Sequence, residues 1–158
     1  MKTYQELWQS LTPLYEASEA QAIVRLVLEV KYGMTLTDII GGKVNELSAD
    51  EGKKLEEIIE RLQNAEPVQY VLGQTDFMGM TFHVEPGVLI PRPETAELCQ
   101  WIIDTEKEKM EKAQLLLHTQ DTKRPNMGKG EGLYELRIVD FCTGSGCIAI
   151  TLNLSIPH

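Results

Sequence analysis

The sequence predicts an α+β chain in three parts: a helical bundle over residues 1–64, a β-hairpin linker over 65–92, and the first βα unit of an α/β domain over 93–158. Amphipathic runs with helix-start signals fill the first part. Val, Tyr, Phe and Thr residues between glycines fill the second, and an apolar run leading into a Gly-rich turn marks the third. A length of 158 residues suits one ordinary domain or two small ones.

Helix-start signals recur in residues 1–64. The capping-box pattern, a Ser or Thr followed three residues later by Glu or Gln, occurs at Thr3 with Glu6, Ser18 with Gln21, and Ser48 with Glu51. Behind each signal, apolar residues repeat on one helical face. Residues 34–40 predict a further short helix before Gly41-Gly42. We therefore expect a small helical bundle with Trp8 in its core.

The composition changes at Pro67, where residues typical of β-strands begin. Residues 68–90 carry Val, Tyr, Phe and Thr punctuated by glycine, which predicts a β-hairpin or a short meander. A turn is expected at 78–81, between Phe77 and Phe82.

A new helix is expected to begin at Pro93, because proline suits the first helical position. Leu98, Trp101 and Ile102 form its apolar stripe, which predicts that Trp101 is buried in the core. The alternating charges of residues 106–112 are expected to extend this helix.

A mobile loop is predicted over residues 119–133, which carry Gln, Asp, Lys, Pro, Asn and three glycines with little to bury. A short buried strand is then expected at 136–139, followed by D-F-C-T-G-S-G at 140–146 and a helix from Cys147 to about Leu154. This arrangement is typical of ligand sites, since glycine lets the backbone approach a ligand and a helix N-terminus offers free N–H groups.

The Gly-rich turn excludes some ligands and favours another. It lacks the third glycine of G-x-G-x-x-G, which argues against NAD and FAD, and lacks the Gly-Lys-Ser/Thr of a P-loop. An acidic strand end followed by x-x-T-G-S-G fits the loop that holds S-adenosylmethionine in class I methyltransferases, with Asp140 near the cationic methionine end of the cofactor. A purely structural Gly turn is the alternative.

Several motifs stand in a fixed order: P-V-Q-Y-V-L-G at 67–73, F-M-G at 77–79, V-L-I-P-R-P-E-T at 88–95, and D-x-x-T-G-S-G at 140–146. Together they resemble the HemK/PrmC family, the N5-glutamine methyltransferases that modify the Gly-Gly-Gln motif of peptide-chain release factors. The resemblance covers the chain except about 119–133. It departs from the family pattern at Ala96, usually Glu, and at Cys142, often Gly.

The resemblance implies roles for individual residues. S-adenosylmethionine is expected as cofactor, bound by Asp140, Cys142, Thr143, Gly144, Ser145 and Gly146. Arg92, Pro93 and Thr95 are expected to line the active site, the alternative being a rigid hinge with Arg92 paired to a local acid. Residues 1–64 are expected to recognise the release factor, the alternative being a domain that only packs on its own catalytic half.

Two parts of the family pattern have no match in these 158 residues. The carboxylate that binds the ribose hydroxyls is expected about 20 residues beyond the Gly turn. The Asn-Pro-Pro-Tyr motif that grips the glutamine amide lies further on, and no Asn-Pro-Pro occurs here. We therefore expect an N-terminal part cut within its catalytic domain, with no catalytic residue and no activity alone. Its strand 136–139, lacking parallel neighbours, favours self-association.

The charge argues against nucleic-acid partners. The chain has 24 acidic and 15 basic residues, a net charge of -9, where nucleic-acid binding normally needs a basic face. This disfavours the closest alternative, a nucleic-acid amine methyltransferase of the Asn-Pro-Pro-Tyr type; a non-catalytic protein-binding module is the second alternative.

Composition also predicts location and metal content. No apolar run approaches the roughly 20 residues of a membrane span, and no signal peptide is evident, so a cytoplasmic protein is expected. The three cysteines and the isolated histidines predict neither a disulfide framework nor a metal site.

Overall fold

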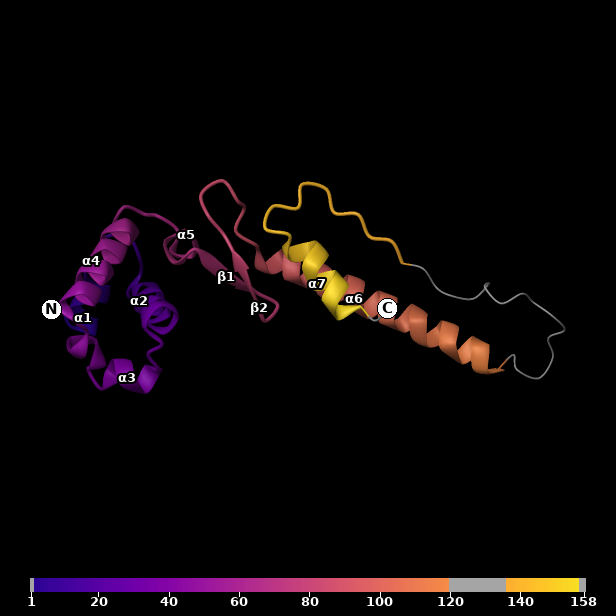
Figure 1. Cartoon of the computed structure of the whole chain (residues 1–158), viewed down its shortest axis with the longest axis horizontal. Helices are drawn as coiled ribbons and strands as arrows, with labels where there is room; N and C mark the ends of the chain where they lie inside the picture. The colour runs from indigo at the N-terminus through magenta and orange to yellow at the C-terminus, as the bar shows by residue number, and fades with distance from the viewer. Residues whose placement is uncertain (1, 120–135, 157–158) are drawn as a thin grey trace. The chain divides into compact units, whose positions relative to one another are not determined.

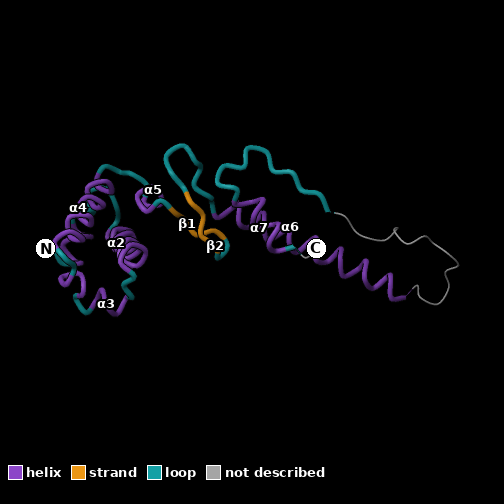
Figure 2. Tube along the Cα trace, viewed as in Figure 1, coloured by secondary structure: helices purple, strands orange, loops and turns teal. Residues whose placement is uncertain are grey.

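The computed structural model describes residues 2–119 and 136–156. The chain divides into two compact units, one formed by Met1–Thr75 with His83–Gly87 and the other by Asp76–Phe82 with Val88–His158. Helices make up most of the described chain, and a two-stranded sheet completes it (Figure 1, Figure 2). The predicted α+β class is confirmed.

The first unit is a bundle of helices around one core. Its elements are α1 (Tyr4–Gln9), α2 (Ala17–Tyr32), α3 (Leu36–Ile40), the 3₁₀ helix η1 (Lys43–Glu46), α4 (Ala49–Gln63) and α5 (Val68–Leu72). In the core, Val24, Val27 and Leu28 of α2 and Leu62 of α4 are fully buried. Trp8 packs half-buried against them, so it lies at the edge of the core rather than within it.

Capping boxes start several helices of this unit. The predicted boxes at Thr3 and Ser48 are confirmed, with the amides of Glu6 and Glu51 each donating to the capping hydroxyl over 3.3 Å. The predicted box at Ser18 is wrong, because α2 already begins at Ala17. Its N-cap residue makes no side-chain capping bond, so burial of the apolar face of α2 fixes this helix start instead.

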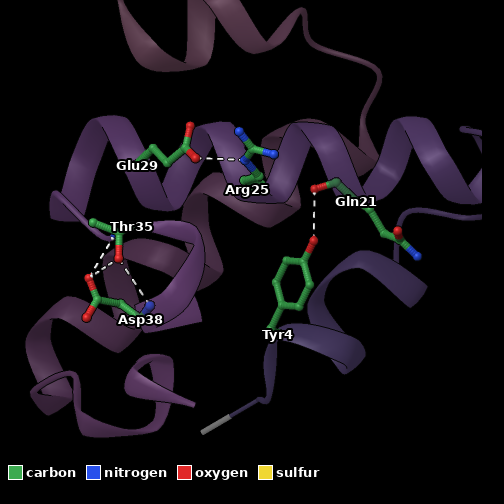
Figure 3. Close-up of polar contacts among 6 residues, drawn as sticks. All are labelled: Tyr4, Gln21, Arg25, Glu29, Thr35 and Asp38. Carbon is green, nitrogen blue, oxygen red and sulfur yellow. Dashed lines mark hydrogen bonds and ion pairs between the residues drawn. The ribbon is translucent and has the colours of Figure 1, made fainter. Parts of the chain in front are cut away.

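A further capping box lies at the start of α3. The hydroxyl of Thr35 accepts from the amide of Asp38 over 3.2 Å, and Oδ2 of Asp38 accepts from the amide of Thr35 over 2.9 Å (Figure 3). A search for Glu or Gln at the third helical position misses this box, since Asp plays the same part here. The short helix predicted over 34–40 is confirmed as α3.

Ser48→Ala should lower the free energy of unfolding by about 1 kcal/mol, the usual contribution of an N-cap hydroxyl. Ser18→Ala is the matched control, because Ser18 lies inside α2 and caps nothing. Alanine favours helix, so the control should leave stability unchanged or slightly raised. Urea unfolding followed by circular dichroism measures both variants, and equal losses would contradict the assignment of the cap.

Acid should weaken the same cap. Hydrogen bonds from the Ser48 hydroxyl and amide hold the pKa of Glu51 below its ordinary value of 4.5. A carboxylate with a depressed folded pKa stabilises the fold above its unfolded pKa and loses this contribution as the pH falls through the folded pKa. Below about pH 4.5 the native chain should therefore lose stability more steeply than the Ser48→Ala variant. Parallel pH profiles would contradict this link.

Residues 68–72 are helical rather than extended. They form α5 between Pro67 and Gly73, whose φ of 74° ends the helix in the left-handed region. Val71 and Leu72 are buried in the core of the first unit. Burial on this core therefore overrides the β propensity of the Val and Tyr residues, and this part of the predicted meander is wrong.

The predicted hairpin is confirmed, but it is shorter than expected. Strands β1 (Gln74–Phe77) and β2 (Met80–His83) pair around Met78 and Gly79, which both have positive φ, 52° and 76°. Such two-residue turns match the twist of paired strands. The turn is shorter than the predicted 78–81, because Met80 and Thr81 belong to β2. No strand forms over 84–90.

The second unit pairs two helices, α6 (Pro93–Thr119) and α7 (Cys147–Ser155). Pro93 is the first residue of α6, and 106–112 lie within that helix, both as predicted. The helix expected from Cys147 is confirmed as α7. The buried core of this unit consists of Phe77, Phe82, Cys99, Ile103, Cys147, Leu152 and Ile156.

The buried face of α6 differs from the predicted stripe. Trp101 is 68% exposed and Leu98 is 47% exposed, so the prediction that Trp101 lies in the core is wrong. Cys99, Ile103 and Glu106 form the buried face instead, at spacings of four and three residues. The helix carries two apolar stripes, and the stripe that contacts the core of the unit is the buried one.

Residues 136–139 do not form the predicted buried strand. Ile138 is 44% exposed and Val139 is 72% exposed. A strand needs a neighbour for its backbone groups, and the two strands of the described chain pair only with each other.

From residue 120 onward, the predicted mobile loop lies outside the described residues. No helix in the described ranges is long and apolar enough to cross a membrane.

Candidate functional site

The loop 140–146 leads from the segment 136–139, which has no regular secondary structure, into α7. Cys142, Gly144 and Gly146 all have positive φ, of 61°, 55° and 76°. Gly144 has open space where a Cβ would stand, whereas a Cβ on Gly146 would lie 3.2 Å from Cδ1 of Ile150. Gly146 is the N-cap of α7, so the free amides of the first helical turn adjoin the loop.

Three polar side-chain atoms at this loop and on α7 are buried without a hydrogen-bond partner in the described chain. They are Oδ2 of Asp140, Oγ of Ser145 and Oγ1 of Thr151. A buried polar atom left without a partner costs about 1–3 kcal/mol, so such atoms mark places where a ligand or further polypeptide supplies the partner. Asp140 and Ser145 belong to the predicted cofactor residues, whereas Thr151 was not foreseen.

The start of α7, directly after the loop, lies next to α6. Cys99 is fully buried on α6, and burial raises the pKa of its thiol, with smaller contributions from Cys147 and Asp140. Cys99 and Cys147 lie in the same buried cluster, so the start of α7 packs against α6 there. Cys147 is also buried, whereas Cys142 is exposed, and all three thiols are free. Among the described residues, no three His, Cys, Asp or Glu side chains group in a way that could hold a metal ion.

The predicted active-site residues at the start of α6 are mostly exposed. Arg92 and Pro93 are exposed and Thr95 is half-buried. The carbonyl of Arg92 accepts from the amide of Thr95 over 3.0 Å, which starts the helix. Within 2–119 and 136–156, the side chain of Arg92 makes no ion pair. No hydrogen bond in these ranges joins the three residues to the loop 140–146.

A groove of 870 Å³ lies between the segment 136–139 and α7. Its walls include Ile138 and Val139 on one side and Ile150, Leu152 and Leu154 on the other. Leu154 is 69% exposed although it is apolar. The sequence predicts a buried strand at 136–139, and a buried strand leaves no open groove.

Comparison with known proteins gives concordant matches. Residues 7–73 match the family model of the PrmC N-terminal domain. The chain is 40% identical over 149 residues to the release factor glutamine methyltransferase of Bacteroides thetaiotaomicron, a match that covers 94% of this chain and 44% of the relative. It is 32% identical over 150 residues to the enzyme of the same name from Flavobacterium psychrophilum, covering 95% of this chain and 45% of that relative.

A third relative of the same name, from Bacillus subtilis, is 30% identical over 155 residues, which cover 98% of this chain and 47% of the relative. The chain thus spans about half the length of the curated relatives it matches. The matches run through the helical first unit and the loop before α7, the same regions that carry the sequence motifs. The chain is therefore similar, over most of its length, to members of the HemK/PrmC family that are named release factor glutamine methyltransferase.

Proposed function

We propose that this chain provides the release-factor recognition unit and the cofactor loop of an S-adenosylmethionine-dependent enzyme that methylates the glutamine amide of Gly-Gly-Gln. The observation that carries the proposal is the loop 140–146, where Asp140 and Ser145 present buried, unpartnered oxygens beside the N-terminus of α7. The names of the relatives support the class of reaction and the class of substrate.

The residues of the loop fit the cofactor. S-adenosylmethionine, when bound, supplies a methyl group on a positively charged sulfur. The carboxylate of Asp140 would hold the cationic methionine end, which gives its unpartnered Oδ2 a charged partner. Ser145 would donate its hydroxyl to the methionine carboxylate, close to the free amides of α7. Gly144 has no side chain to block this approach.

The proposed roles divide along the chain. Residues 1–64 recognise the release factor, 65–92 link the parts, and 93–158 begin the methyltransferase domain, with Arg92, Pro93 and Thr95 near the substrate glutamine. Methyl transfer to an amide depends mainly on positioning the nitrogen in line with the methyl group. The sequence holds no Asn-Pro-Pro motif to accept the amide hydrogens. We therefore expect no methyl transfer by the 158-residue chain alone.

A chimera tests the proposal. Residues 1–158 are followed by the part of the Bacteroides thetaiotaomicron relative that has no counterpart in this chain. Methyl-labelled cofactor and the release factor of that organism are the substrates. Label should enter the release factor, and replacing the glutamine of its Gly-Gly-Gln by alanine should abolish incorporation. A folded chimera that transfers no label, or label that persists after this replacement, would overturn the proposal.

A further inference from the structure

One face of α6 exposes a tryptophan between carboxylates. Trp101 is 68% exposed and Leu98 is 47% exposed. Glu94 and Glu97 are exposed on the same side of the helix, because residues three, four and seven positions after Glu94 share one helical face. These four residues are the Trp101 face. The buried Cys99 lies on the opposite side of α6, so the Trp101 face is not part of the core of the second unit.

The charges beside the tryptophan indicate the chemistry of a partner. Within 2–119 and 136–156, Glu94 and Glu97 make no ion pair, and residues 65–104 hold six acidic side chains against one basic side chain. Glu94 lies in the first turn of α6, where the helix dipole favours an acid, but Glu97 lies beyond that turn. Lys and Arg side chains bind carboxylates and also stack on an indole ring. The Trp101 face therefore fits a basic protein surface, and tryptophan is typical of the residues that contribute most to such contacts.

The position of the Trp101 face on α6 indicates which partner carries that basic surface. The helix begins at Pro93, which is proposed to lie near the substrate glutamine, and a rise of 1.5 Å per residue places Trp101 about 12 Å further along the axis. A protein that presents its glutamine at the start of α6 is large enough to contact both places. We propose that the Trp101 face docks a basic surface of the release factor, outside the glutamine site. The choice of partner rests on the proposed function.

Titration of the release factor of Bacteroides thetaiotaomicron into the 158-residue chain and into the chimera tests this docking surface. Trp101→Ala should weaken binding about tenfold or more in both proteins, as is usual when a central aromatic contact is lost. Leu154→Ala is the matched control, since Leu154 is 69% exposed but lies on α7, and it should leave the affinity unchanged. Both replaced side chains are exposed, so the variants should keep the helical circular dichroism of the native chain.

Glu97→Gln tests the electrostatic part of the contact. Binding of the native chain should weaken as the salt concentration rises, because salt screens exposed charges. Glu97→Gln should weaken binding about threefold at low salt and make it less sensitive to salt. Glu111→Gln is the control, since Glu111 is exposed further along α6 and outside the Trp101 face. It should change neither the affinity nor its dependence on salt.

Four outcomes would overturn the proposal: a native chain that does not bind the release factor, a Trp101→Ala chimera with native affinity, an equal loss in Leu154→Ala, or a dimer of the chain that Trp101→Ala dissociates. The second would mean that the rest of the enzyme covers the Trp101 face, and the last would assign it to a second copy. The readout is binding, so a chimera that binds through Trp101 but transfers no label counts against the proposed function alone. An active chimera whose affinity does not depend on Trp101 counts against the docking surface alone.

Discussion

Leu28→Ala should lower the free energy of unfolding of the first unit by about 3 kcal/mol, within the usual range for a buried leucine. Leu28 is fully buried in the core of the helical bundle, so its loss removes apolar contact and leaves a cavity. Such a loss is a large fraction of the stability of a small domain. Denaturant unfolding followed by circular dichroism measures the change.

Leu26→Ala is the control on the same helix, because Leu26 is 38% exposed. Its cost should stay below about 1 kcal/mol, as is usual for surface positions. Similar losses for Leu26→Ala and Leu28→Ala would contradict the orientation of α2 in the bundle.

Asp140→Asn in the chimera should weaken binding of S-adenosylmethionine roughly ten- to hundredfold, the effect of losing a hydrogen bond to a charged group. Asparagine keeps the shape of the side chain and removes the negative charge that the cationic methionine end would require. Titration calorimetry measures the affinity, and the rate of label transfer at low cofactor concentration should fall in parallel.

Asp104→Asn provides the matched control, because Asp104 is exposed on α6 and bonded to Gln100 over 2.9 Å. It should leave the affinity unchanged. If Asp140→Asn binds the cofactor as tightly as this control, Asp140 has no role in the cofactor site.

Local signals in the sequence predicted much of the fold. The caps at Thr3 and Ser48 and the start of α6 at Pro93 depend on residues within one helical turn, so the sequence alone suffices to find them. The predictions that failed concern residues whose structure depends on non-local packing. Val71 and Leu72 are helical because the core of the first unit buries them, and Trp101 is exposed because the neighbouring stripe packs on the core.

The candidate site likewise has features that depend on local sequence and features that depend on residues far away in the chain. The glycines of the loop 140–146 predicted a sharp turn into α7, and the backbone has that turn. The strand before it could not form, because a parallel strand depends on neighbours far away in the sequence and none is present in the described chain. The open groove and the unpartnered Thr151 follow from that non-local requirement, so no motif could have indicated them.

Titration of S-adenosylmethionine into the 158-residue chain and into the chimera tests most directly whether the loop 140–146 is a cofactor site that further polypeptide completes. We expect the chain alone to bind more weakly than about 100 µM, and the chimera to bind at least about tenfold more tightly than the chain. A chain that binds below about 100 µM, or a folded chimera that binds no better than the chain, would contradict this account of the loop.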